Sequence, residues 1–170
     1  MKISDKLLKI LNFLTLFLFL LPVSRLDLFH ENYSTLSLDT RGYFFLLFLG
    51  IITGIIMAYE TRFISGKRNS IILLMGMIMG TMIPHHYPYD MQGDLHLLFA
   101  YIGFTALAVI TFMNTYFSKK QASYQKILFL LGGLSCALYL RHGMVNTLNE
   151  VFIMMACMAI NLMIYLERNG

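Results

Sequence analysis

Charged side chains are scarce in this chain, and tryptophan is absent. Asp, Glu, Lys and Arg make up 13% of the 170 residues, whereas apolar residues make up 58%. A soluble domain carries roughly 25% charged residues, so this composition excludes an ordinary soluble fold. The only two cysteines, Cys136 and Cys157, lie in apolar segments without a CxxC spacing, which argues against a disulfide framework or a redox pair.

Motifs that bind phosphate or nucleic acid are also missing. The chain has no phosphate-binding glycine loop, no Gly-x-Ser-x-Gly nucleophile motif and no nucleic-acid-binding module. Its pI is near 9.1, but the basic residues lie in short connections between apolar segments. We therefore interpret them as topology signals and contacts to anionic lipids, and we expect no nucleic-acid partner.

Apolar segments are what the sequence has in abundance. Six of them predict an all-α fold: a single integral membrane domain over residues 1–170 that forms a six-transmembrane-helix bundle. They cover about 7–23, 43–59, 71–83, 95–117, 127–140 and 151–166. A spanning helix needs roughly 20 apolar residues, which the first, second and fourth segments provide. The third and fifth are short and the sixth is marginal, but each can extend into flanking residues. Four spans with two shallow helices is the alternative.

The first segment could also be a signal peptide, because lysines precede it. Its end, Pro22-Val-Ser-Arg25, has no convincing small-x-small cleavage site. We expect it to remain in the protein as a helix.

Basic residues divide unevenly between the two sides of the predicted bundle. Ten lie on the side of the chain ends: Lys2, Lys6, Lys9, Arg62, Lys67, Arg68, Lys119, Lys120, Lys126 and Arg168. Three lie on the other: Arg25, Arg41 and Arg141. The positive-inside rule then predicts a multi-pass protein of the cell membrane with both termini in the cytoplasm. All five histidines fall on the outer side: His30, His85, His86, His96 and His142.

Glycines recur four residues apart in two neighbouring segments. Gly50 and Gly54 form one small-xxx-small pattern, and Gly76 and Gly80 form another. Such patterns let helix backbones approach closely in lipid. They predict a hairpin of the second and third helices, joined by a basic turn over 60–70. A homodimer interface is the other interpretation.

The fourth segment carries a stripe of small and polar residues. Its members share one helix face: His96, Ala100, Gly103, Leu107, Thr111 and Asn114. We expect this face to point into the bundle. An ionisable group in a membrane span is costly, so His96 is a candidate binding residue that organises an outer polar pocket with Asp90 or Asp94 and with His142. The structural alternative is a neutral, hydrogen-bonded interfacial histidine.

The approach to this helix resembles a known family. Pro88 and Asp90 precede a His-xxx-Ala-xxx-Phe pattern formed by His96, Ala100 and Phe104. This arrangement resembles the DRAM/FRAG-type six-helix membrane proteins, and more closely their bacterial relatives of unknown function. The resemblance implies a six-helix bundle, and some eukaryotic members are tied to lipid-anchor maturation or lysosomal membranes. It implies no catalytic mechanism.

Three functions fit these features. The first is a non-enzymatic lipid-binding or lipid-handling protein, with membrane lipids as partners and no cofactor. The second is a membrane-embedded zinc-dependent lipid hydrolase with ligands from His85, His86 and His96, although no His-xxx-His pair lies on a helix. The third is a small proton-coupled transporter, which would be expected to place an acid near the centre of an apolar segment; none has one. We expect the first.

Overall fold

The computed structural model describes residues 3–21, 26, 33–38, 40–84, 91–142 and 147–169. These residues form six α-helices and one short 3-10 helix, and they contain no strand. The elements are α1 (Asp5–Leu20), η2 (Tyr33–Leu38), α2 (Thr40–Ile64), α3 (Lys67–Met82), α4 (Met91–Thr115), α5 (Gln121–His142) and α6 (Thr147–Asn169). The all-α prediction is confirmed.

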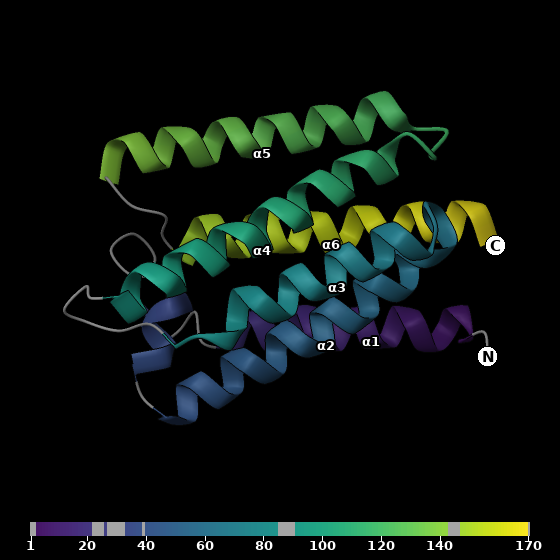
Figure 1. Cartoon of the computed structure of the whole chain (residues 1–170). Coiled ribbons are helices and arrows are strands. Elements are labelled where there is room, and N and C mark those ends of the chain that lie inside the picture. The colour runs from purple at the N-terminus through teal and green to yellow at the C-terminus, as the bar shows by residue number, and fades with distance from the viewer. Residues whose placement is uncertain are drawn as a thin grey trace.

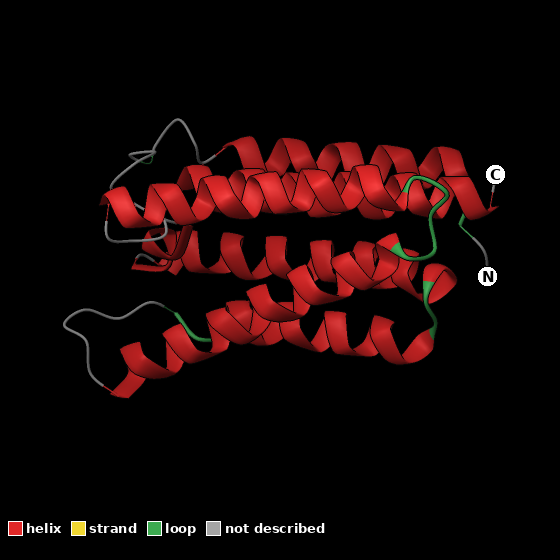
Figure 2. Cartoon of the chain, turned by 90° about the horizontal axis from the view of Figure 1, so that it is seen from above, coloured by secondary structure: helices red, strands yellow, loops and turns green. Residues whose placement is uncertain are grey.

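The helices lie lengthwise against one another in a bundle (Figure 1). The first residues of α1 and the last residues of α6 lie at the same end of the bundle as the α2–α3 and α4–α5 turns. We call this the terminal end, and the other the loop end. α3 packs between α2 and α4, and α6 contacts α1, α2, α4 and α5. α5 lies at the edge of the bundle (Figure 1), and its main contacts among the described elements are with α4 and α6. Figure 2 shows the same bundle from above.

Among the described residues, four helices are long and apolar enough to cross a membrane: α2, Asp94–Thr115 of α4, Gln121–Arg141 of α5, and α6. α1 and α3 have 16 residues each, which is about 24 Å at roughly 1.5 Å per residue, less than the ~30 Å hydrocarbon core. The first segment is predicted to reach residue 23; its described α-helix ends at Leu20, and residues 22 and 23 lie outside the described part of the chain. The fifth and sixth helices are longer than predicted because they take up the polar residues before them.

The bundle is apolar outside and partly polar inside. Leu130 on α5 is 73% exposed and Leu140 is 82% exposed. Asn114, Asn161 and Glu60 are fully buried. A soluble protein would not present such large apolar side chains to water beside buried polar ones, whereas a membrane protein turns its ionisable groups inward. This inverted polarity and the four long apolar helices support a helical membrane protein with transmembrane helices.

The glycines of α2 and α3 pack inside the chain, but not all against each other. A side chain at Gly50 or Gly54 would meet Thr81 or Met77 of α3, as the hairpin prediction expects. Those of α3 turn the other way: a Cβ at Gly76 would lie 2.5 Å from Ala106 Cβ, and one at Gly80 would lie 3.3 Å from Gly103 Cα, both on α4. The prediction that all four join α2 to α3 therefore needs correction, because α3 uses opposite faces for its two neighbours.

The turn between α2 and α3 is also shorter than predicted. α2 continues to Ile64, and only Ser65 and Gly66 separate it from α3. Gly66 has φ 102°, a backbone conformation that favours glycine. Ser70 Oγ donates to Ala58 O across the turn (2.7 Å). Glu60, which the sequence placed in a basic connection, therefore belongs to α2 and lies inside the bundle.

Candidate functional site

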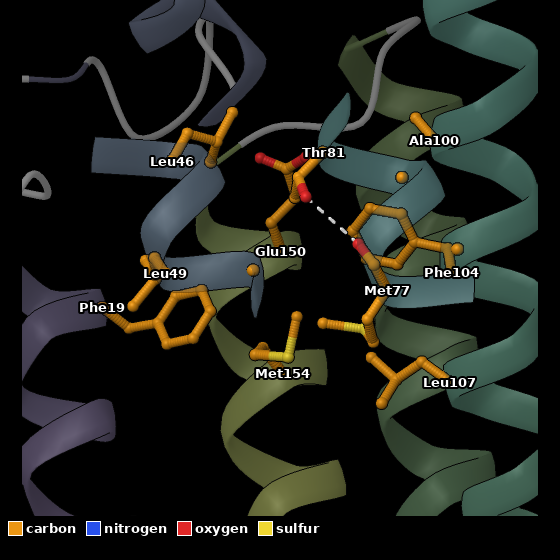
Figure 3. Close-up of a pocket in the computed structure, with 13 residues that line it drawn as sticks. Phe19, Leu46, Leu49, Met77, Thr81, Ala100, Phe104, Leu107, Glu150 and Met154 are labelled. Atoms are coloured by element: carbon orange, nitrogen blue, oxygen red, sulfur yellow. Dashed lines mark hydrogen bonds between the residues drawn. The ribbon is translucent and has the colours of Figure 1, made fainter. Parts of the chain in front are cut away.

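A pocket lies in the bundle core toward the loop end, between α1, α2, α3, α4 and α6 (Figure 3). The centre of a water molecule could move within a volume of about 80 Å³ in this pocket. Its lining comes from Phe19, Leu46, Leu49, Gly50, Met77, Gly80, Thr81, Ala100, Gly103, Phe104, Leu107, Glu150 and Met154. The residues come from the last turns of α1 and α3, the first half of α2, the middle of α4 and the first turns of α6, so the pocket lies toward the loop end of the bundle.

Small residues form part of the wall of this pocket. Ala100 and Gly103 from the α4 stripe face Gly80 of α3, and Gly50 lines the wall on α2. The stripe predicted on α4 does face the bundle: Ala100 is half-buried, and the other five members are buried. Part of the pocket wall is therefore helix backbone with little or no side chain, at the place where α3 and α4 are in close contact.

The pocket has one polar side in an otherwise apolar wall. Figure 3 shows the oxygen atoms of Thr81 and Glu150 toward its upper side, with Met154 and Leu107 below. Thr81 Oγ1 donates to Met77 O (3.2 Å). Glu150 lies in the first turn of α6, where the helix dipole favours a carboxylate. The arrangement suits a molecule with an apolar body and a polar end.

His96 joins α4 to the end of α3 and does not line this pocket. Its side chain is 2% exposed, and Nδ1 donates to Ile83 O (2.6 Å), since a carbonyl can only accept. Ile83 follows α3 and precedes Pro84. The histidine therefore satisfies a carbonyl at a helix end, which agrees with the structural interpretation of a hydrogen-bonded histidine near the boundary.

The partners expected for His96 are not assembled around it in the described part of the chain. Asp94 is exposed and makes no hydrogen bond or ion pair there; residues two apart on a helix do not face each other. Of the two carboxylates predicted as partners of His96, Asp94 therefore does not pair with it, and the pairing with Asp90 stays a prediction. Asp90, His30, His85 and His86 lie outside the described residues, as does the side chain of His142.

The described residues also lack a metal-binding cluster. No group of three His, Cys, Asp or Glu side chains in these ranges could hold an ion. Two ligands of the zinc alternative, His85 and His86, are among the residues outside the description.

A second group of polar side chains is buried toward the terminal end, and it links α2, α4 and α6. Asn114 Nδ2 donates to Thr61 Oγ1 (3.0 Å) and to Asn161 Oδ1 (2.6 Å). Asn161 Nδ2 in turn donates to Thr111 Oγ1 (2.9 Å). Ser65 Oγ donates to Asn114 Oδ1 (2.6 Å), so the group reaches the α2–α3 turn.

Beside it, a carboxyl group is paired with an amide. Asn12 Nδ2 of α1 donates to Glu60 Oε1 of α2 (2.7 Å) and to Leu8 O (3.1 Å). Glu60 is fully buried, and Asn12 is 2% exposed. An uncompensated charge in such a place is expensive, which makes Glu60 the most unusual side chain in the bundle.

Of these polar residues, the sequence singled out only Thr111 and Asn114, and not Asn12, Glu60, Thr61, Ser65 or Asn161. Asn12 and Asn161 interrupt the first and sixth apolar segments, and a single amide within such a segment is a signal for an inward face. Glu60 had no comparable signal, because it follows the second segment and precedes Arg62. Glu60 lies inside the bundle because α2 continues beyond the apolar segment to Ile64.

Comparison with known protein families, curated proteins and solved structures finds no match for this chain.

Proposed function

We propose that this chain is a multi-pass protein of the cell membrane that binds a membrane lipid in the core pocket without catalysing a reaction. One observation carries this proposal: the pocket wall is apolar except for Thr81 and Glu150. The apolar wall fits a hydrocarbon segment, and the carboxylate fits a lipid headgroup atom that donates a hydrogen bond or carries positive charge. Ligand sites commonly combine an apolar lining with a few placed polar groups.

In this proposal all six α-helices cross the membrane and both chain ends are cytoplasmic. The described basic residues support it. Those at or near the terminal end are Lys6, Lys9, Arg62, Lys67, Arg68, Lys119, Lys120, Lys126 and Arg168, against Arg41 and Arg141 at the loop end. The short α1 and α3 require local bilayer thinning or help from flanking residues. The pocket then lies in the outer half of the membrane.

We also propose a relationship to the bacterial relatives of the DRAM/FRAG-type proteins. The three described residues of the resemblance lie on α4 beside the pocket: His96 fixes α4 to α3, and Ala100 and Phe104 line the wall. Membrane lipids are the partners in this proposal, and nucleic acid is not. The glycines of α2 and α3 contact neighbouring helices of the same chain. A homodimer would therefore have to form through another surface of the bundle.

Photochemical crosslinking tests lipid binding directly. The full chain would be reconstituted into vesicles of phosphatidylethanolamine that contain a trace of the same lipid with a photoreactive group on one acyl chain. After illumination, we expect mass spectrometry to find the label on pocket residues such as Met154 and Phe104. Ala100→Leu places a branched side chain at the pocket wall and should reduce that label several-fold.

The matched control is Ala137→Leu on α5, where the same change falls on an exposed face. It should leave the pocket label unchanged. Glu150→Gln should keep acyl-chain labelling but weaken the preference for an amine headgroup over a choline headgroup. Label confined to exposed residues such as Phe129 and Leu140, and insensitive to Ala100→Leu, would contradict the proposal.

A further inference from the structure

The buried pair of Glu60 and Asn12 takes no part in the lipid pocket. It lies where α1 meets α2, toward the terminal end, whereas the pocket lies toward the loop end. Neighbouring apolar side chains, including Leu8, Ile56 and Ile160, close this region from the surrounding lipid. A fully enclosed carboxyl group in a membrane protein is a candidate functional group by default.

Two oxygen atoms of the pair lack a donor within the described residues. They are Glu60 Oε2 and Asn12 Oδ1. An ionised carboxylate and an amide oxygen are both acceptors only, so a charged Glu60 would leave two buried acceptors side by side in the pair. A proton on Oε2 turns that atom into a donor. A carboxylic acid and a primary amide can then pair through two hydrogen bonds, one of which is already present between Asn12 Nδ2 and Glu60 Oε1 (2.7 Å).

Within the described part of the chain, no side chain offers a positive charge to an ionised Glu60. Asn12 is its only bonded partner among the described residues. The described ionisable groups in this region are Tyr59 of α2, Asp5 of α1 and Tyr165 of α6. Tyr165 interacts electrostatically with the other two and with Glu60. Tyrosine is neutral near pH 7, and Asp5 is an acid. Lys6 and Lys9 of α1 are exposed.

A separate hydrogen-bonded group lies next to this pair along α2, toward the terminal end. Thr61 follows Glu60 on α2 and accepts from Asn114, which also accepts from Ser65. Ser65 is partly exposed at the α2–α3 turn. This group brings polar side chains to the residue that follows Glu60 on α2 and continues to the partly exposed Ser65.

We propose that Glu60 is an exchangeable proton-binding site, held in its protonated form by Asn12. In the exchange, Glu60 Oε2 takes a proton from a hydronium ion of the solution at the terminal end and leaves water behind; the reverse step returns it. The site gives the chain the proton-binding group that a proton-coupled membrane protein requires. It stands independently of lipid binding, since it uses none of the pocket residues.

Infrared spectroscopy distinguishes a protonated carboxyl group from a carboxylate. Spectra of the full chain in lipid nanodiscs at neutral pH would be compared between the wild type and Glu60→Gln. We expect the wild type to show the carbonyl band of a protonated acid, shifted in heavy water, and the variant to lack it. Glu167→Gln, which changes an exposed carboxyl group of α6, is the control and should keep the band. Loss of carboxylate bands instead, with no protonated-acid band to lose, would overturn the proposal.

A second measurement needs no variant. A hydrophobic carbodiimide adds the O–H of a protonated carboxyl group across one C=N bond, and the adduct rearranges to a stable N-acylurea that mass spectrometry detects. We expect labelling at Glu60 of the wild type that decreases several-fold as the pH of the solution is raised. Absence of label at Glu60 across the pH range, while other carboxyl groups react, would overturn the proposal even if Glu60→Gln did not fold.

Discussion

Asn114 of α4 donates a 2.6 Å hydrogen bond to Asn161 of α6, with both side chains fully buried. Asn114 also bonds to Thr61 and Ser65 of the α2 end, so one amide connects three helices through its two polar atoms. In lipid, where apolar surfaces gain little by meeting each other, such bonds fix which helix faces touch.

Replacing either asparagine by leucine should therefore destabilise the bundle. We expect Asn114→Leu and Asn161→Leu each to lower the free energy of unfolding by about 1–3 kcal/mol, because each leaves a buried partner unsatisfied. The double variant should lose less than the sum, with a coupling of about 0.6–1.7 kcal/mol. Unfolding in mixed detergent micelles measures all three. Met163→Leu, on the exposed side of α6, is the control; additive losses would show that the two amides act separately.

The α3–α4 seam gives a second prediction. A Cβ at Gly103 would lie 2.8 Å from Gly76 O and 3.0 Å from Gly80 Cα, and neither backbone atom can move aside cheaply. We expect Gly103→Ala to cost about 1–3 kcal/mol, as overpacking typically does. Gly132→Ala on α5 is the matched control, since a Cβ there meets nothing within 4 Å. Thermal denaturation in detergent compares them, and equal midpoints would show that α3 and α4 are farther apart than described.

The bond from His96 to Ile83 O gives a third. His96→Leu removes the donor for this carbonyl while filling much of the same space, and we expect a loss of about 1–3 kcal/mol. His85→Ala, in the connection before α4, should have little effect. The same unfolding assay compares the two variants. A His96→Leu protein as stable as the wild type would show that the histidine is kept for binding and not for joining α3 to α4.

The proposed orientation gives a fourth. In a background with Cys136 and Cys157 replaced by alanine, a cysteine at position 92 should react with a membrane-impermeant thiol reagent added to intact cells. A cysteine at position 118, in the α4–α5 turn, should react only after the cells are opened. These residues lie at the loop end and the terminal end respectively. The reverse labelling pattern would show that the bundle has the opposite orientation, with the pocket in the inner half of the membrane.

Hydropathy predicted the helices well because each apolar segment is separated from the next by charged or proline-containing connections. It predicted helix ends poorly. α2 continues through Glu60, Thr61 and Arg62 because polar residues at a membrane boundary do not interrupt the backbone hydrogen bonds of a helix. Inside the bundle, Thr61 accepts a hydrogen bond from Asn114. Sequence composition marks the apolar length of a segment and not the length of its helix.

The face that each helix turns toward the bundle interior was predictable only where one side of the helix differed clearly in composition from the others. The stripe on α4 did, and it faces the bundle. Gly76 and Gly80 identify a face of α3 that can approach another helix, but nothing in their spacing selects α4 over α2. The pocket could not be predicted either, because it is a space left by residues from five helices whose relative rotation no single segment specifies.

The edge position of α5 has a consequence for local stability. Tyr124 is its only buried side chain among those described, and a groove of about 330 Å³ lies between it and α4 and α6. With so little apolar surface enclosed, α5 should separate from the bundle at a lower free energy than any neighbour and behave as its own cooperative unit. Proteases and hydrogen exchange would then reach α5 first when lipid is replaced by detergent, while α2, α3 and α4 still hold together as the slowest part to open.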